Sequence, residues 1–188
     1  MNENENETIT LLPGDRFTFK GLEWIVLDNN VDGGILIITA FKWGDESLQF
    51  DENGSNNYKE STLRKHLSDE LLPVLGCHNL LPYEVSLIAD NGENDYGSVK
   101  DLVFILSCDD YRKYRKYIPN EEQWTCTPSY VTYSEYNAPL RYISFDTYFR
   151  EDYARTDMWV FPACVLNQNR LKITKRIEVM EREEEEWE

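Results

Sequence analysis

Short apolar runs separated by turn residues fill the first forty positions of the chain. We predict four strands, over residues 8–12, 16–20, 23–28 and 35–40. Pro13-Gly14-Asp15 and Gly33-Gly34 supply turn residues between them. Because these runs are close together in sequence, they predict an antiparallel meander built from local hairpins. Trp24 lies inside the third run, so we expect it in the core.

A long polar segment precedes the first predicted helix. Ser61 is a suitable N-cap residue, and Leu63 and Leu67 follow it at the spacing of one helix face. Ser68 is interpreted as a cap that begins a second helical turn. Pro73 has no backbone N–H, so it is expected to shorten or kink that turn.

A strand predicted over residues 102–106 leads into the second helix. Ser107 and Asp110 have the spacing of a capping box, which predicts a helix to about residue 118. Three apolar positions recur at helical spacing and are expected to face the core: Tyr111, Tyr114 and Ile118. The intervening positions form a basic cluster of Arg112, Lys113, Arg115 and Lys116. We interpret this cluster as a solvated helix face, and contact with an acidic partner is the alternative.

Residues 124–150 are rich in aromatic side chains but show no sustained strand or helix periodicity. Pro128 and Pro139 interrupt the segment, which predicts irregular backbone at the surface. Exposed aromatic rings on loops held by a rigid sheet are typical of binding surfaces. The predicted ligand-binding residues are Trp124, Tyr130, Tyr133, Tyr136, Tyr142 and Tyr148. The alternative is that this segment folds back and buries its rings.

The most apolar segment spans residues 158–166, and Asn167-Gln168-Asn169 predicts a hairpin turn into residues 170–174. The order of strands, helices and strands predicts an α+β fold. We expect a twisted antiparallel sheet, two or three short helices and long irregular loops. The predicted domain limits are a disordered acidic N-terminus over 1–7, one domain over 8–177, and an acidic tail over 178–188.

The formal net charge is −16, and more than half of it lies in the two termini. An acidic surface repels nucleic acid and anionic lipid, and it favours a basic patch on a partner protein. No apolar run reaches the roughly 18 residues of a membrane span. The N-terminus lacks the basic and apolar regions of a signal peptide, so we expect a cytoplasmic protein.

Few side chains suit catalysis or metal binding. The cysteines contain no Cys-x-x-Cys pair and are expected to be free thiols in or near the core: Cys77, Cys108, Cys126 and Cys164. The two histidines, His66 and His78, do not point to a catalytic triad. The loops 51–57 and 90–95 are rich in oxygen ligands but lack the spacing of a calcium loop. We therefore predict no metal, cofactor or catalytic residue.

Five motifs in order resemble the uncharacterised bacterial family DUF6273. They begin at Gly14, Ser61, Asp101, Trp124 and Trp159, and read GDRFTFKGLEWIVLD, STLRKHL, DLVFILS, WTCTP and WVFPACVL. The resemblance covers roughly residues 9–175 and implies a layout like the C-type-lectin and formylglycine-generating-enzyme folds. The family's arginine before Ser-Pro is Thr127 or absent here, and Phe161 stands where the family has an arginine before Pro-Ala.

Together these patterns predict a non-enzymatic binding domain whose partner is a protein. The first alternative is an acidic phage or mobile-element inhibitor that mimics the charge of nucleic acid, and it rests on the net charge. The second alternative is an enzyme related to the formylglycine-generating fold. That enzyme requires a reactive pair of cysteines with lowered pKa values.

Overall fold

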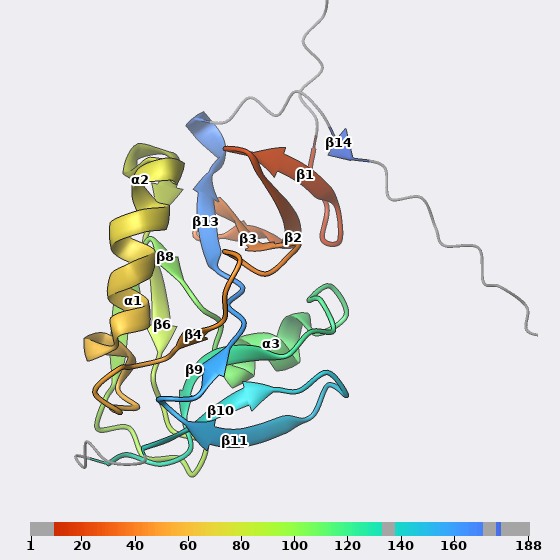
Figure 1. The fold of residues 1–188 in the computed structure, drawn as a ribbon. Helices are drawn as coiled ribbons and strands as arrows, with labels where there is room; N and C mark the ends of the chain where they lie inside the picture. Colours follow the sequence, from red (N-terminus) through yellow and green to blue (C-terminus); the bar gives the residue numbers. More distant parts are fainter. Residues whose placement is uncertain (1–9, 133–137, 171–175, 178–188) are drawn as a thin grey trace, which may run out of the picture.

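The computed structural model describes residues 10–132, 138–170 and 176–177. Its main body is a seven-stranded antiparallel sheet (Figure 1). The strands follow the order β14-β1-β2-β3-β13-β5, and β8 also pairs with β13. Their bounds are β1 Arg16–Phe19, β2 Leu22–Val31, β3 Gly34–Thr39, β5 Leu80–Leu81, β8 Val103–Phe104, β13 Ala163–Asn167 and β14 Arg176–Ile177.

The strands β1 to β3 form the predicted meander. A tight turn joins β2 to β3 at Asp32 and Gly33, whose φ angles are 49° and 80°. Positive φ at both turn residues suits the right-handed twist of the flanking strands, so β2 extends beyond its predicted end. Trp24 is fully buried, as predicted, and its indole N–H donates to the carbonyl of Phe19 at 3.1 Å.

One helical segment runs without a break through α1 (Thr62–His66), the π-helical turn η2 (Leu67–Leu71) and α2 (Leu72–Leu75). Ser61 caps it as predicted, because its hydroxyl accepts a hydrogen bond from the Arg64 N–H at 3.1 Å. The predicted second cap is wrong, since Ser68 lies inside the π-turn. Pro73 does not end the helix. The wider turn before it makes room for a ring that would otherwise crowd the carbonyl four residues earlier.

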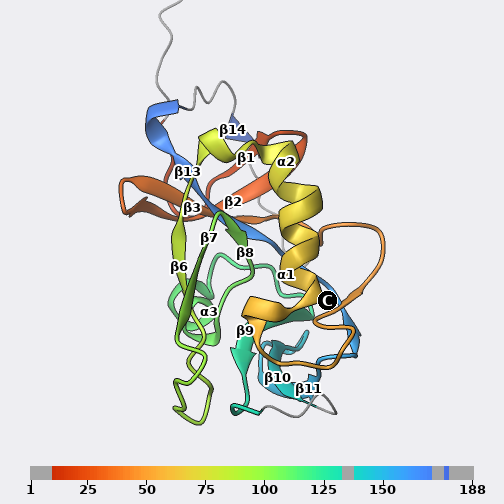
Figure 2. The ribbon, with the colours of Figure 1, turned by 90° about the vertical axis from the view of Figure 1, so that its left-hand side faces the viewer.

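Shorter elements surround this helix and the main sheet. They are β4 Leu48–Gln49, η1 Tyr58–Glu60, η3 Cys77–Asn79, β6 Tyr83–Ser86, β7 Ser98–Asp101, β12 Asp157–Met158 and η4 Gln168–Arg170. The strands β6 and β7 form a two-stranded ribbon, and β4 pairs with β12. Figure 2 shows α1 and α2 standing beside β8, β7 and β6.

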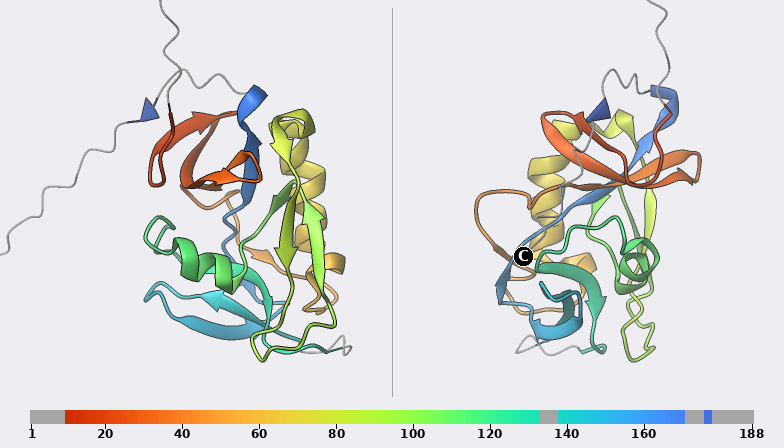
Figure 3. Two further views of the ribbon diagram at one scale, coloured as in Figure 1. Left: turned by 180° about the vertical axis from the view of Figure 1, so that it is seen from behind. Right: turned by 90° about the vertical axis from the view of Figure 1, so that its right-hand side faces the viewer.

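A second sheet lies at the other end of the molecule from β1 to β3, and α3 (Cys108–Tyr114) lies between them (Figures 1 and 3). The sheet has the order β11-β10-β9, with β9 Gln123–Pro128, β10 Pro139–Ile143 and β11 Phe149–Tyr153. The capping box at the start of α3 is present as predicted. Tyr111, Tyr114 and Ile118 are buried as predicted, although α3 ends at Tyr114.

The α+β class and the antiparallel pairing are confirmed, but the described strands divide into four sheets rather than one. Residues 10–12 are irregular rather than a strand, and η4 replaces the predicted hairpin turn after β13. The ends of these strands depend on pairing with strands that are distant in sequence, and a local sequence pattern does not predict that pairing. Residues 1–7, 171–174 and 178–188 lie outside the described residues. Within the described residues, no helix has the length and apolar character needed to cross a bilayer.

Candidate functional site

Trp124 was predicted to bind a ligand, and the structure corrects this. Its side chain is only 2% exposed. The indole N–H donates to the carbonyl of Leu48 at 3.0 Å, and the ring lies edge-on to Phe50 with centroids 6.0 Å apart. Trp124 is therefore a core residue, because β4 and the loop after it cover the face of β9 from which it projects.

The other predicted aromatic residues separate into buried and exposed ones. Tyr142 lies opposite Trp124 in β10, where it is half-buried and edge-on to that indole. Tyr130 and Tyr148 are 45% and 68% exposed. Tyr133 and Tyr136 lie outside the described residues. The prediction of irregular backbone is wrong for residues 124–128, 139–143 and 149–150, which belong to the paired strands β9, β10 and β11. The pairing of β9 with β10 shifts register between Leu140 and Tyr142.

Two of the exposed aromatic rings lie on one turn, which joins β10 to β11 and spans residues 144–148. We call it the aromatic turn. Phe145 is 75% exposed, and Tyr148 lies three residues further along the same turn. Tyr130 and Tyr153 are exposed at the opposite end of this sheet. Phe145 is the residue that sequence reasoning missed. Its available signal was the Ser-Phe-Asp-Thr sequence, which is typical of a turn.

Internal hydrogen bonds fix the aromatic turn. The Ser144 N–H donates to the carbonyl of Tyr148 at 3.0 Å, and the Thr147 N–H donates to the carbonyl of Ser144 at 2.7 Å. Asp146 accepts hydrogen bonds from the hydroxyl of Ser144 and from Arg150, the latter at 2.6 Å. These two donors lower the pKa of Asp146, so it is ionised near neutral pH. The turn therefore presents Phe145 and Tyr148 from a defined backbone.

A basic hollow adjoins this turn. Its volume is about 630 Å³, and it is lined by Ile118, Asn120 and Thr147 together with Arg112, Lys113, Arg115 and Lys116. Two contacts join the α3 side of the hollow to the second sheet and its aromatic turn. Arg112 stacks 4.6 Å above the ring of Phe149, and Arg115 donates a hydrogen bond to the hydroxyl of Thr147. The predicted basic cluster and one end of the aromatic segment therefore form one continuous surface.

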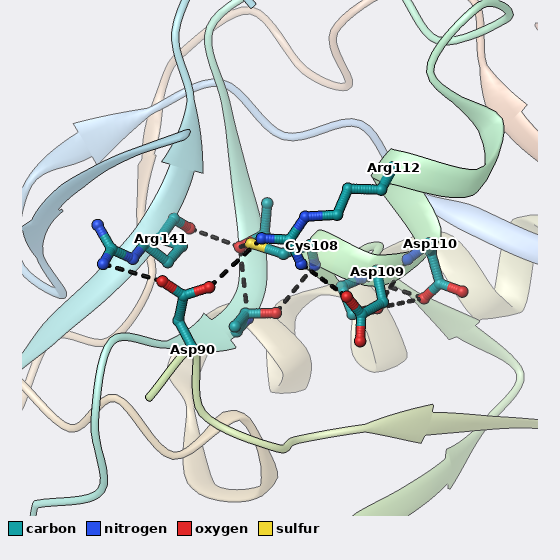
Figure 4. A network of polar contacts seen from close by, with 9 residues as sticks. Asp90, Cys108, Asp109, Asp110, Arg112 and Arg141 are labelled. Atoms are coloured by element: carbon teal, nitrogen blue, oxygen red, sulfur yellow. Dashed lines mark hydrogen bonds and ion pairs between the residues drawn. The ribbon is translucent and has the colours of Figure 1, made fainter. Parts of the chain in front are cut away.

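Behind this surface, Asp90 links two arginines (Figure 4). One of its oxygens lies 3.4 Å from Arg112, and the other lies 2.9 Å from Arg141. The nearby Cys108 sulfur is 3.6 Å from the hydroxyl of Thr125. Burial raises the pKa of Cys108 to about 11, so the thiol stays protonated near neutral pH. This network joins the loop at Asp90 to α3 and β10.

The remaining candidates for nucleophilic chemistry are dispersed. All four cysteines are free thiols, and Cys77 is the exposed one. Burial raises the pKa values of Cys126 and Cys164, whereas a reactive thiol needs a lowered value. His66 packs edge-on against Trp43, with ring centroids 5.2 Å apart. The burial of Cys108, Cys126 and Cys164 and the ring contact of His66 are those of packed side chains.

The two oxygen-rich loops use their oxygens within the protein. In the first loop, the Asp51 carboxylate accepts from the N–H groups of Ser55 and Thr62, at 2.8 and 3.0 Å. In the second, Glu93 accepts from the Val131 N–H at 2.7 Å. Within the described part of the chain, no three His, Cys, Asp or Glu side chains form a group that could hold a metal ion.

Comparisons with protein-family models, curated proteins and solved structures found no match to this chain. The functional argument therefore rests on the geometry of the aromatic turn and the basic hollow.

Proposed function

We propose that this chain is a non-enzymatic protein-interaction domain that binds its partner through the aromatic turn. The observation that carries the proposal is the exposure of Phe145 and Tyr148 on a turn fixed by its own hydrogen bonds. Large aromatic rings that are already held in place bury much surface and lose little conformational entropy on binding.

The distribution of exposed rings supports this surface. Among the described residues, five aromatic side chains are strongly exposed, and four of them belong to the β9–β11 sheet or its flanks: Tyr130, Phe145, Tyr148 and Tyr153. The fifth, Phe41, follows β3 in the main sheet. Single exposed rings are ordinary on protein surfaces, whereas Phe145 and Tyr148 lie on the same short turn, and neighbouring exposed rings are a feature of interaction sites.

The two alternatives have less support. An inhibitor that mimics nucleic acid needs a surface of carboxylates, but the surface beside the aromatic turn is basic. An enzyme related to the formylglycine-generating fold needs reactive cysteines, and three of the four cysteines here have raised pKa values. Membership of DUF6273, a C-type-lectin-like arrangement and a cytoplasmic location belong to the proposal as well, and their support is the sequence alone.

The test compares the proteins captured from host lysate by three forms of the chain. We expect Phe145→Ser combined with Tyr148→Ser to lose a partner that the parent captures, with no loss of stability. Phe41→Ser is the matched control, because it removes an equally exposed ring from the main sheet. A partner captured equally by all three forms would refute the proposed surface.

A further inference from the structure

The four cations of the basic hollow are not equivalent. Arg112 forms ion pairs with Asp109 and Asp90, and Lys113 lies 3.5 Å from Asp28. Arg115 and Lys116 are exposed, and within the described residues neither has an acidic partner in ion-pair range. The hollow thus combines two neutralised cations with two cations that are available to a ligand.

This local excess of positive charge stands out in a chain whose net charge is −16. Arg115 and Lys116 are adjacent in sequence and line the same hollow, so their positive charges act together on one surface. Their neighbours are defined too. Arg115 bonds to Thr147 of the aromatic turn, and Lys116 stacks 4.6 Å above the ring of Tyr117. Positive charge and exposed aromatic area therefore lie on one face.

We propose that the basic hollow and the aromatic turn together bind an acidic segment of a partner protein. Carboxylates of that segment pair with Arg115 and Lys116, and an apolar side chain of the same segment packs on Phe145 and Tyr148. The inference rests on the proposed function and specifies the chemistry of the partner. Charge complementarity identifies this occupant, because opposite charge steers the encounter while the rings supply most of the buried apolar area.

A peptide is favoured over a nucleic acid by the remaining charge of the molecule. A nucleic acid extends over many phosphates, and the net charge of −16 opposes its binding through long-range repulsion. A short peptide needs only two or three favourable charge contacts.

The experiment uses the full chain and a fluorescein-labelled peptide with about ten glutamates around one tryptophan. We expect the peptide to bind, and a matched glutamine peptide to bind at least about tenfold more weakly, with affinity falling as salt rises from about 0.05 to 0.5 M. Arg115→Gln combined with Lys116→Gln should weaken binding about tenfold. The control pair, Lys59→Gln with Lys100→Gln, removes two exposed cations from the hollow beside α1 and should have no effect.

Equal binding by the Arg115/Lys116 variant and the parent would overturn the inference, as would a labelled oligothymidylate that binds in place of the peptide. A further full-length variant has the seven glutamates of residues 178–188 changed to glutamine. If this variant binds the peptide and the parent does not, the chain's own glutamate-rich terminus occupies the surface in the parent. That result would overturn the proposal of an external partner. The proposed function is tested separately. It would be refuted only if the variant with Phe145→Ser and Tyr148→Ser captured the partner as well as the parent does.

Discussion

The strands β3 and β13 of the main sheet and the strand β11 of the second sheet all pair antiparallel, yet they differ in exposure. Every residue of β3 is buried, and so are four of the five residues of β13. No residue of β11 is fully buried. The strand β9 has only one neighbour in its sheet, as β11 does, yet all six residues of β9 are buried, so what packs over a strand decides its exposure rather than its position in the sheet.

This contrast shows that aromatic content does not by itself identify a binding surface. Trp24 belongs to β2 of the main sheet and Trp124 to β9 of the second sheet, and both are buried. Phe145 and Tyr148 differ from them because their turn projects beyond the last paired residues, Ile143 and Phe149. The same residue types therefore serve as core or as surface, according to what covers them.

The largest expected effect follows from replacing the two buried indoles. Trp24→Ala and Trp124→Ala should each lower the free energy of unfolding by about 3–5 kcal/mol, because each leaves a large cavity. Chemical denaturation measures this. Tyr148→Ser is the control and should change stability by less than about 0.5 kcal/mol. A stable Trp124→Ala variant that loses partner binding would return Trp124 to the binding surface.

A smaller loss of stability is expected when Asn56 is replaced, because this residue connects the loop before α1 to the second sheet. This side chain is fully buried, donates to the carbonyls of Tyr130 and Pro139 at 2.9 Å each, and accepts from the Tyr96 hydroxyl at 2.8 Å. Asn56→Ala should lower the free energy of unfolding by about 2–4 kcal/mol, because buried groups lose a hydrogen-bond partner. Exposed Asn94→Ala is the control. Equal stability of both variants would show that the hydrogen bonds of Asn56 are not needed to hold the loop before α1 against the second sheet.

The cysteines provide a test that leaves stability unchanged. In the folded protein at about pH 8, we expect a maleimide to modify Cys77 readily and the buried thiols slowly. Cys108 has a pKa of about 11, so its reactive thiolate becomes abundant only as the pH approaches that value. Mass spectrometry of the labelled protein measures the sites. After unfolding without reductant, four thiols should react, and two or fewer would disprove free cysteines.

The smallest effect is expected from deleting residues 178–188. Seven of these eleven residues are glutamate, so the segment offers little apolar surface for the body to bury. The strand β14 ends at Ile177 and is retained by this deletion. Thermal denaturation should show that the free energy of unfolding changes by less than about 0.5 kcal/mol. A fall of many degrees would instead show that these residues stabilise the body.

Features that depend on neighbouring residues were predictable from the sequence. The Ser107–Asp110 capping box and the Ser61 cap need only a few residues of chain, so their chemistry is local. The turn at Gly33 is also local, because positive φ is available to glycine without steric cost. The apolar runs around Trp24 likewise identified the core, since a continuous apolar strand must be covered on both faces.

The candidate site depended on contacts between distant residues. Trp124 is buried because the carbonyl of Leu48, 76 positions earlier, accepts its N–H. The surface formed by the aromatic turn and the basic hollow exists because Arg115 meets Thr147, 32 positions later. The sequence alone determined the α+β class, the caps at Ser61 and Ser107, the turn at Gly33 and most of the core. Only the tertiary structure decided which aromatic rings are exposed and which cations lie beside them, because exposure is set by what packs over a side chain and that neighbour comes from elsewhere in the chain.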